Sequence, residues 1–243
     1  MSALLEVRHL RKRFGGIAAV DDCSFEVDQG TVTALIGPNG SGKTTVFNLI
    51  TGYVAADAGD VVFNGRRYPR PTPGRLCHDG LVRTFQQARV FPALTVLDNL
   101  VAAAAHPWWA LASPRVSRAD RATAGELIVE FGLGKVADLP ASQLSYGQRK
   151  LLEFAAVLMS EPKLVLLDEP TAGVNPNLVA TMERHIRERH AKGITFLVVE
   201  HDMNVVMRLC DPVIVLDHGA TIARGAPAAV QANPAVLDAY LGE

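Results

Sequence analysis

Residues 37–45 read GPNGSGKTT, and they directly follow the short apolar run TVTALI at residues 31–36. The run has the length and the β-branched composition of a buried strand. A glycine, four further residues and the triplet GKT match the spacing of a phosphate-binding loop, a motif that lies between a strand and a helix. The sequence therefore predicts a strand, a glycine-rich loop and a helix that together bind a nucleotide phosphate.

Each residue type in this loop suits that ligand. Glycine at positions 37, 40 and 42 lacks a Cβ, so the backbone can direct several N–H groups toward one anion. The helix expected from Lys43 adds the positive end of its dipole, the lysine ammonium can reach the β and γ phosphates, and the Thr44 hydroxyl can bind Mg²⁺. A plain turn before a core helix is the alternative, and it is a poor match to this combination.

The amino-acid composition restricts the class of protein only broadly. The 243 residues are 49% hydrophobic, which allows one large core in a single elaborated domain. Lys plus Arg total 24 and Asp plus Glu total 25, so no overall positive field indicates nonspecific nucleic-acid binding, although a local basic patch is still compatible with these totals. Three widely spaced cysteines are typical of reduced thiols in a cytosolic protein.

The sequence favours neither a membrane span nor a secretory signal. Its longest apolar stretch, at residues 100–112, is interrupted by His106-Pro107 and is shorter than the roughly 20 residues that a spanning helix needs. The basic residues near the start follow a short apolar run and precede no hydrophobic region, unlike those of a signal peptide.

Two carboxylates end another apolar segment, KLVLLDE at residues 163–169. A wholly apolar strand is typical of a parallel sheet, in which ligands bind beyond the carboxyl ends of the strands. Buried carboxylates at that edge need a partner cation or a solvent-filled cleft. Asp168 therefore fits a Mg²⁺ ligand acting through water, and Glu169 fits the group that polarises the attacking water.

Three further candidates lie at the ends of expected strands. His201 comes after the strand ITFLVV at residues 194–199 and could bond a γ phosphate, although such a histidine is more often structural. Gln86 ends the strand expected at residues 81–85, where a polar residue could also simply cap the edge. Phe14 ends an early strand and could stack on a base, although an ordinary half-buried phenylalanine is equally typical of that position.

The segment LSYGQ at residues 144–148 precedes an amphipathic helix. Ser145 lies where an N-cap is expected, and an ordinary capped helix would explain it. The same geometry presents a serine hydroxyl, a glycine backbone and a helix dipole to a nearby anion.

The pattern of the remaining chain is strand and helix in alternation, interrupted once. We expect an antiparallel pair of strands at residues 4–14 and 23–28, and loops or hairpins elsewhere between core elements. Residues 95–131 are helical in character, with Ser117 and Asp120 as a capping-box variant, and predict a helical insert. Trp108 and Trp109 would pack on that insert or form a patch for a partner. His185 and His190, five residues apart on a helix, are expected on a solvated face.

The other expected elements are ordinary parts of the core. Strands are expected at residues 60–65, 213–216 and 221–224, a proline-rich loop at 68–74, and helices at 43–51, 175–193 and from Pro227 and Pro234.

The phosphate loop, Gln86, LSYGQ, LVLLDEP and VVEHD occur in this order, and the chain thereby resembles the nucleotide-binding subunit of an ABC transporter across nearly its whole length. RTFQ at 83–86, AGVNP at 172–176 and the terminal YLGE look like the branched-chain amino-acid importer ATPases, to which urea and lipopolysaccharide-exporter ATPases are similar. The resemblance implies one ABC-type ATP-binding domain over residues 1–243. Its α/β P-loop NTPase (RecA-like) core would comprise 1–86 and 160–243, with an antiparallel β flank, and the inserted helical subdomain with the signature motif would comprise 87–159.

The resemblance also implies the roles of individual residues. ATP would be bound by Phe14, Gly37, Pro38, Asn39, Gly40, Ser41, Gly42, Lys43, Thr44, Thr45, Ser145, Gly147 and Gln148. Mg²⁺ would be bound by Thr44, Gln86 and Asp168, and the catalytic residues would be Glu169, His201 and Gln86. Ser145 and Gly147 would contact the γ phosphate held by a second copy. Tyr146 and Asn175 depart from the glycine and aspartate that are commoner in the family.

The implied partners are a second copy or a paralogous ATPase subunit, integral membrane permease subunits and, indirectly, a solute-binding protein. Nucleic acid is not among them. The implied location is the cytoplasmic face of a bacterial inner membrane, and the implied function is ATP-driven import of branched-chain or related amino acids. A soluble ABC-type ATPase that acts on DNA or in assembly is the alternative from another class.

Overall fold

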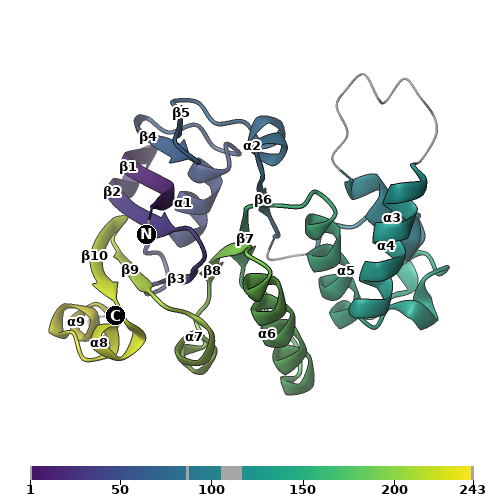
Figure 1. The fold of residues 1–243 in the computed structure, drawn as a ribbon. Coiled ribbons are helices and arrows are strands. Elements are labelled where there is room, and N and C mark those ends of the chain that lie inside the picture. Colours follow the sequence, from purple (N-terminus) through teal and green to yellow (C-terminus); the bar gives the residue numbers. More distant parts are fainter. Residues whose placement is uncertain (1, 86–87, 105–116, 242–243) are drawn as a thin grey trace.

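A computed structural model describes residues 2–85, 88–104 and 117–241 of the chain (Figure 1). Gln86, Trp108 and Trp109 lie outside the described residues. The described part contains two β-sheets, helices around them, and a group of helices set to one side. The expected α/β class is confirmed.

The first sheet is antiparallel and has the strand order β2-β1-β4-β5. Its members are β1 (Ala3–Phe14), β2 (Ile17–Asp28), β4 (Ala58–Phe63) and β5 (Arg66–Tyr68). In the register, Glu6 lies opposite Glu26 on one side and opposite Val62 on the other. The expected antiparallel flank is therefore present, and its second strand begins six residues earlier than the sequence indicated.

The second sheet has six strands in the order β10-β9-β3-β8-β7-β6. Its members are β3 (Val32–Ile36), β6 (Leu81–Arg83), β7 (Leu164–Asp168), β8 (Thr195–Val199), β9 (Val213–Asp217) and β10 (Ala220–Gly225). All neighbours pair in parallel except β9 and β10, and every residue of β3, β7 and β8 is buried. Parallel pairing brings the carboxyl ends of β3, β8, β7 and β6 to one edge, where the candidate residues follow.

Helices surround this sheet and also form the insert. They are α1 (Lys43–Ile50), α2 (Pro73–Asp79), α3 (Val96–Ala103), α4 (Arg118–Glu130), α5 (Tyr146–Leu158), α6 (Pro176–Ala191), α7 (Met203–Leu209), α8 (Pro227–Gln231) and α9 (Pro234–Leu241). In Figure 1, α3 and α4 lie to one side of the strands, and α5 lies between them and β7. Phe154 of α5 packs edge-on against Phe196 of β8, so α5 contacts the sheet as well. The helical subdomain at 87–159 stays a prediction.

The prediction of a loop over residues 68–74 is wrong in part. Tyr68 ends β5, and Pro73 begins α2, which ends at Gly80 with a φ of 101°. Proline is favoured at the first position of a helix because its missing N–H has no intrahelical partner there, and glycine is favoured at a left-handed end. These two residues therefore mark the start and the end of α2, which the proline-rich composition led us to predict as a loop.

The helix caps follow the sequence closely. Ser145 accepts a hydrogen bond from the backbone of Gln148, whose side chain returns a bond to the Ser145 N–H, so the two form a capping box. Asn175 caps α6 with Pro176 at the first helical position, and Ser117 caps α4 by accepting from Ala119.

The expectation for His185 is wrong. Its side chain is completely buried on α6, and its ring stacks on Phe131 with centroids 4.1 Å apart. Burial lowers the pKa of His185. The apolar residues Met182 and Ile186 of α6 pack in the same core cluster as Phe131 at the end of α4. His185 lies on the same side of α6 and is therefore buried with them.

A carboxylate cluster surrounds this histidine. Ligand atoms of Glu130, His185 and Glu188 lie within 4.8 Å of one another. Arg189 bonds Glu130, and an Arg184 nitrogen lies 3.3 Å from Glu188, so both carboxylates are paired with guanidinium groups. The cluster is thus an ion-pair network that joins α4 to α6.

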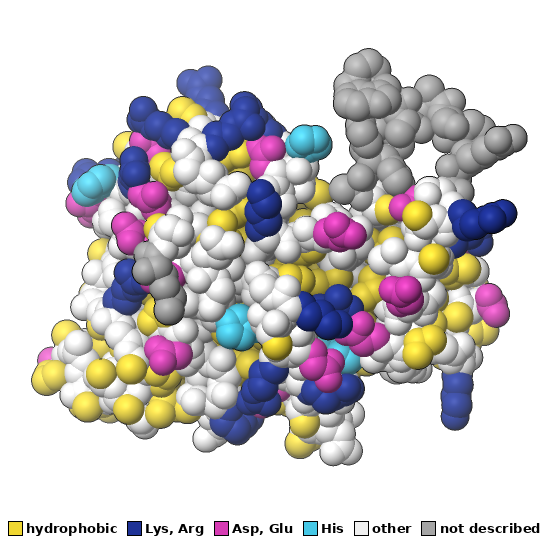
Figure 2. All heavy atoms as spheres, in the orientation of Figure 1, with side chains coloured by type: hydrophobic (Ala, Val, Ile, Leu, Met, Phe, Trp, Pro, Cys, Tyr) yellow, Lys and Arg dark blue, Asp and Glu magenta, His cyan; other side chains and the backbone are white. Residues whose placement is uncertain are grey.

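Charges of both signs are interspersed with apolar side chains over the face shown in Figure 2, in agreement with the near-zero net charge. Within the described ranges, no helix is long and apolar enough to cross a membrane. Cys23, Cys77 and Cys210 are free thiols, and burial raises the pKa of Cys23 to about 11.

Candidate nucleotide-binding and hydrolytic site

The glycine-rich loop connects β3 to α1 at the carboxyl edge of the six-stranded sheet. Gly42 has a φ of 98°, and a Cβ added there would lie 2.5 Å from the Ala19 carbonyl oxygen. At Gly37 an added Cβ would lie 2.1 Å from the Leu216 carbonyl oxygen. Both positions therefore require glycine for two reasons, backbone conformation and close contact with a neighbouring chain segment.

The loop brings its polar groups to one place. Lys43 Nζ donates hydrogen bonds to the carbonyl oxygens of Gly37 and Pro38, each at 2.7 Å, so the ammonium lies over the loop. Asn39 and Gly40 are exposed, as is Thr44 in the first turn of α1, with Thr45 beside it. This exposed helix start combines a cation, backbone N–H groups and a hydroxyl, which is the chemistry that binds phosphate.

Asp168 and Glu169 leave the same edge at the end of β7. Asp168 is almost fully buried, and its Oδ2 accepts a hydrogen bond of 2.6 Å from Arg83 at the end of β6. Glu169 has a φ of 48°, and its backbone N–H donates to the Val199 carbonyl oxygen. A positive φ at a residue that is not glycine is strained, and such strain clusters at functional sites.

His201 joins this pair from the neighbouring strand. Because β7 and β8 are parallel and Asp168 lies opposite Val199, the residues that follow the two strands meet. His201 Nδ1 lies 3.5 Å from Glu169 Oε1. Lys150, buried on α5, donates to the Glu169 carbonyl oxygen at 3.0 Å. A carboxylate and an imidazole are thus held together beside the central strands.

The signature segment, residues 144–148, lies at the start of α5 and not at the glycine-rich loop. Residues 145–148 line a hollow together with residues 173–175, 177 and 178, and a Cβ added to Gly147 would lie 2.5 Å from Leu178 Cδ2. The glycine-rich loop lines a different hollow with Asp217, His218 and part of α9. The two hollows share no described residue. Within the described residues, the glycine-rich loop and residues 145–148 therefore do not line a common hollow.

Phe14 is half exposed at the end of β1, and Lys12 Nζ lies 5.5 Å from its ring centroid. An exposed aromatic ring at a strand end has a free face for stacking.

Sequence reasoning missed two buried charges at the junction of the strands and the helical insert. Arg83 pairs with Asp168, as described above. Glu153 on α5 accepts hydrogen bonds from the backbone N–H groups of Phe85 and Arg89, and burial raises its pKa. The sequence signal was a charged residue within an otherwise apolar strand or helix face.

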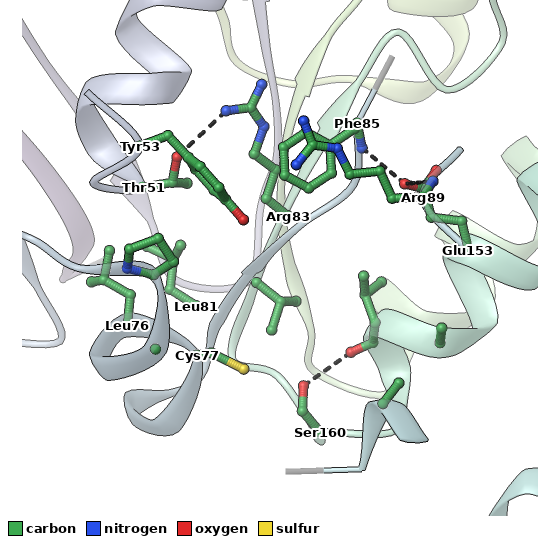
Figure 3. A pocket seen from close by; sticks show the side chains of 16 residues that line it. Thr51, Tyr53, Leu76, Cys77, Leu81, Arg83, Phe85, Arg89, Glu153 and Ser160 are labelled. Carbon is green, nitrogen blue, oxygen red and sulfur yellow. Dashed lines mark hydrogen bonds between the residues drawn. The ribbon is translucent and has the colours of Figure 1, made fainter. Parts of the chain in front are cut away.

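The same junction holds a pocket of about 400 Å³ (Figure 3). Tyr53, Leu76, Phe85 and Arg89 are among the residues that line it. Its wall combines side chains of the core, of α2 and of α5. An apolar hollow between two parts of a chain is a common position for a ligand or a partner segment.

The family model described as ABC transporter matches residues 20–172, which cover the loop, the signature segment and the acidic strand. The chain belongs to the ABC transporter ATPases. A second model, described as branched-chain amino acid ATP-binding cassette transporter, matches residues 220–243 of this ABC ATPase.

Full-length relatives narrow the position of this ABC ATPase within the family. It is 36% identical to the high-affinity branched-chain amino acid transport ATP-binding protein BraF of Pseudomonas aeruginosa, over 99% of this chain and 98% of that protein. It is also 36% identical to LivG of Escherichia coli, which bears the same description, with the same coverage. The chain therefore belongs to the branched-chain amino-acid transport group.

A solved structure agrees with this assignment. The fold matches a nucleotide-free ATP-binding cassette from an ABC transporter with a TM-score of 0.88, at 36% identity and over 100% of both chains. Cassettes of this family hydrolyse ATP, dimerise and work with membrane permease components.

Proposed function

We propose that the chain is the ATP-hydrolysing subunit of an importer of branched-chain or related amino acids. The full-length similarity to BraF and LivG supports the substrate class, because both names specify branched-chain amino acid transport. The observation that carries the catalytic part is the Glu169–His201 pair, whose Oε1 and Nδ1 atoms lie 3.5 Å apart. The two residues follow the paired strands β7 and β8, and β8 also pairs with β3, which leads to the glycine-rich loop.

Binding of ATP follows from the loop geometry. The exposed start of α1 directs N–H groups to the phosphates, and Lys43, now on two loop carbonyls, would exchange them for the β and γ phosphates. Phe14 would stack on adenine with its exposed ring face. The other loop residues of the set, namely Gly37, Pro38, Asn39, Gly40, Ser41, Gly42, Thr44 and Thr45, would surround the phosphates.

The donor set fits Mg²⁺. Thr44 offers an exposed hydroxyl and Asp168 a carboxylate, which are the hard oxygen donors that this ion prefers. Mg²⁺ would neutralise phosphate charge as the bond to the γ phosphate breaks. Gln86 is proposed as a further ligand. Thr44 would hold the ion directly and Asp168 through water.

Hydrolysis then depends on positioning by the chain. Glu169 would polarise the attacking water and accept its proton, and His201 would donate a hydrogen bond to a γ-phosphate oxygen. Gln86 would orient the same water. The strained backbone at Glu169 and the bond from Lys150 to its carbonyl oxygen fix the main chain that carries the carboxylate with respect to the sheet edge.

A second subunit would complete the site. The glycine-rich loop and the Ser145–Gly147–Gln148 segment line separate hollows of this chain, which supports a site that draws the two segments from different subunits. In a head-to-tail pair, the signature segment of one subunit would face the γ phosphate bound by the other. The partner would be a second copy or a paralogous ATPase subunit.

Permease subunits would bind at the junction pocket, which would hold the ATPase at the cytoplasmic face of a bacterial inner membrane. The pocket is lined largely by apolar side chains and joins the core to the helical part, so a segment seated there would sense their relative movement. A solute-binding protein would act through the permeases and would not touch this chain.

Glu169→Gln tests the catalytic role with little change in volume. Phosphate release should fall by about 10²-fold or more, because a general base typically contributes that much. The variant should also sediment as a dimer with ATP, since the closed state would persist. Glu126→Gln, an exposed site on α4, is the matched control and should hydrolyse ATP normally. Wild-type turnover in Glu169→Gln would remove Glu169 from this role.

Copurification tests the transport role. Capture of the tagged chain from solubilised membranes should recover polytopic membrane proteins, identified by mass spectrometry. DNA-stimulated turnover without such partners would instead favour a soluble ABC ATPase.

A further inference from the structure

Arg83 lies between the end of β6 and the acidic end of β7. Its Nη2 donates a 2.6 Å hydrogen bond to Asp168 Oδ2, and the two side chains are only 5% and 4% exposed. A buried charge pair of this kind is expensive to separate, because each partner would be left without compensation. The Asp168 carboxylate is therefore restrained by one specific guanidinium.

The same guanidinium is itself held from a third element. Arg83 Nη1 donates to Asn48 Oδ1 at 2.6 Å and lies 3.4 Å from Thr51 Oγ1, both at the carboxyl end of α1. Asp168 further donates its backbone N–H to Thr84 Oγ1 at 3.3 Å. The arginine thus connects the helix that begins at the glycine-rich loop with the strand that ends at Asp168.

Aromatic rings explain why this position has an arginine. The guanidinium carbon lies 4.9 Å from the Phe85 ring centroid and 5.5 Å from that of Phe47 (Figure 3 shows Arg83 beside Phe85 and Tyr53). A planar guanidinium can lie against rings and still donate several bonds in fixed directions, whereas an ammonium is a compact point charge. A lysine would keep the charge but could not satisfy Asn48 and Asp168 in this geometry.

We propose that Arg83 is a positioning residue that orients the Asp168 carboxylate for Mg²⁺ and so sets the metal affinity of the ATP site. The proposal rests on the proposed function, in which Asp168 is a ligand of that ion through water. Groups that orient a metal ligand by hydrogen bonding fix its direction and basicity, and their loss typically lowers metal affinity. Arg83 is in the position to do this because it bonds one carboxylate oxygen from the side of the core.

The test compares Arg83→Lys with Arg89→Lys in the full-length chain. Arg89 also lies on the Phe85 ring, at 3.7 Å, and lines the same pocket, so both variants lose a guanidinium–ring contact and keep the charge. Mn²⁺ is titrated against each protein with a nonhydrolysable ATP analogue, and free Mn²⁺ is measured by electron paramagnetic resonance. Arg83→Lys should weaken Mn²⁺ binding by about tenfold, and Arg89→Lys should leave it unchanged.

Two further measurements separate positioning from general damage. Nucleotide affinity in excess chelator should be the same in wild type and Arg83→Lys, because none of the hydrogen bonds described for Arg83 reaches residues 37–45. The Mg²⁺ concentration for half-maximal hydrolysis should rise in parallel with the Mn²⁺ dissociation constant. Equal Mn²⁺ affinity in a folded Arg83→Lys, or an equal loss with Arg89→Lys, would overturn the proposal.

Asn48→Leu provides the same test without disturbing the buried pair. It removes the oxygen that holds Arg83 Nη1 and leaves Arg83 and Asp168 in place. A weaker Mn²⁺ affinity, smaller in effect than that of Arg83→Lys, is expected even if Arg83→Lys does not fold. Unchanged Mn²⁺ affinity in Asn48→Leu would then count against the proposal. If wild type binds no Mn²⁺ in the presence of the analogue, the proposed metal-dependent ATPase function is itself wrong, and the proposal for Arg83 is overturned with it.

Discussion

Glu153 Oε1, on the helix that follows the signature segment, accepts a hydrogen bond of 3.1 Å from the Phe85 backbone N–H. The same oxygen accepts another at 3.1 Å from the backbone of Arg89. Phe85 and Arg89 lie on either side of Gln86, so one carboxylate ties both flanks of that segment to α5. A shift of α5 would therefore displace the backbone at Phe85 and at Arg89.

Glu153→Ala should destabilise the fold measurably. Two partly buried backbone N–H groups would lose their acceptor, and each should cost about 1 kcal/mol, the lower end of the range for a buried unsatisfied donor. Urea denaturation of wild type and variant gives the difference in free energy of unfolding. Glu126→Ala, at an exposed position on α4, should differ from wild type by less than about 0.5 kcal/mol. A similar small effect at Glu153 would contradict the anchoring role.

Glu153→Gln should alter the pH dependence of stability. Burial raises the pKa of Glu153 above its ordinary value of 4.5, so the folded state holds the proton more tightly than the unfolded chain. The stability contribution of this group is present below 4.5 and is lost as pH rises through the folded pKa. Wild type should therefore lose stability relative to Glu153→Gln over that interval, as measured by urea denaturation at stepwise pH. A pH-independent difference would be inconsistent with the raised pKa.

Ser145→Ala and Ser117→Ala separate a structural cap from a nucleotide contact. Both serines cap helices by accepting from a backbone N–H, so each variant should lose about 1 kcal/mol of stability. Only Ser145 is proposed to face the nucleotide of a second subunit. In the Glu169→Gln background, ATP-driven dimerisation measured by sedimentation should fall for Ser145→Ala and stay unchanged for Ser117→Ala. Equal dimerisation in both would leave Ser145 as a cap alone.

Gly42→Ala should be more damaging than Gly40→Ala. Both glycines have positive φ, of 98° and 79°, but an added Cβ meets the Ala19 carbonyl oxygen at 2.5 Å only at Gly42. Gly40→Ala should therefore cost about 1 kcal/mol of backbone strain, whereas Gly42→Ala should also displace the loop and weaken ATP binding. Chemical denaturation and nucleotide titration measure the two effects. Similar values for the two variants would show that close contact is unimportant there.

His185→Phe should stabilise the protein, most of all in acid. Both ring nitrogens of His185 are buried without a hydrogen bond, although Nδ1 lies 3.5 Å from Glu188 Oε2. Their removal should gain about 1 kcal/mol while the stack on Phe131 is kept, because the Glu188 carboxylate is also paired with Arg184. Burial lowers the folded pKa below 6.5, and the stability that depends on the neutral ring is lost as pH falls from 6.5 through the folded value. The advantage of the variant in denaturation experiments should therefore grow over this interval. A constant advantage would argue against the lowered pKa.

Patterns between near neighbours in the sequence were sufficient to predict most strands and helices. Strands such as β3 and β7 are continuous apolar runs, and helix starts at Ser145 and Asn175 carry side chains that satisfy their own backbone N–H groups. The helix α2 was missed because its boundaries depend on a proline and a glycine that are equally typical of a loop. The burial of His185 was not predicted, because the spacing of residues along a helix does not show which side of the helix another element will cover. Here Phe131 covers the side that bears His185.

The sequence by itself determined the phosphate loop, the alternation of strands and helices, and the candidate residues at strand ends, because these depend on contacts between near neighbours in the chain. Only the tertiary structure decided that Arg83 pairs with Asp168, that Glu153 holds Phe85, and that the loop and Ser145 lie apart. Those relationships join residues tens of positions apart. Sheet order and helix packing set them, and no local pattern encodes either.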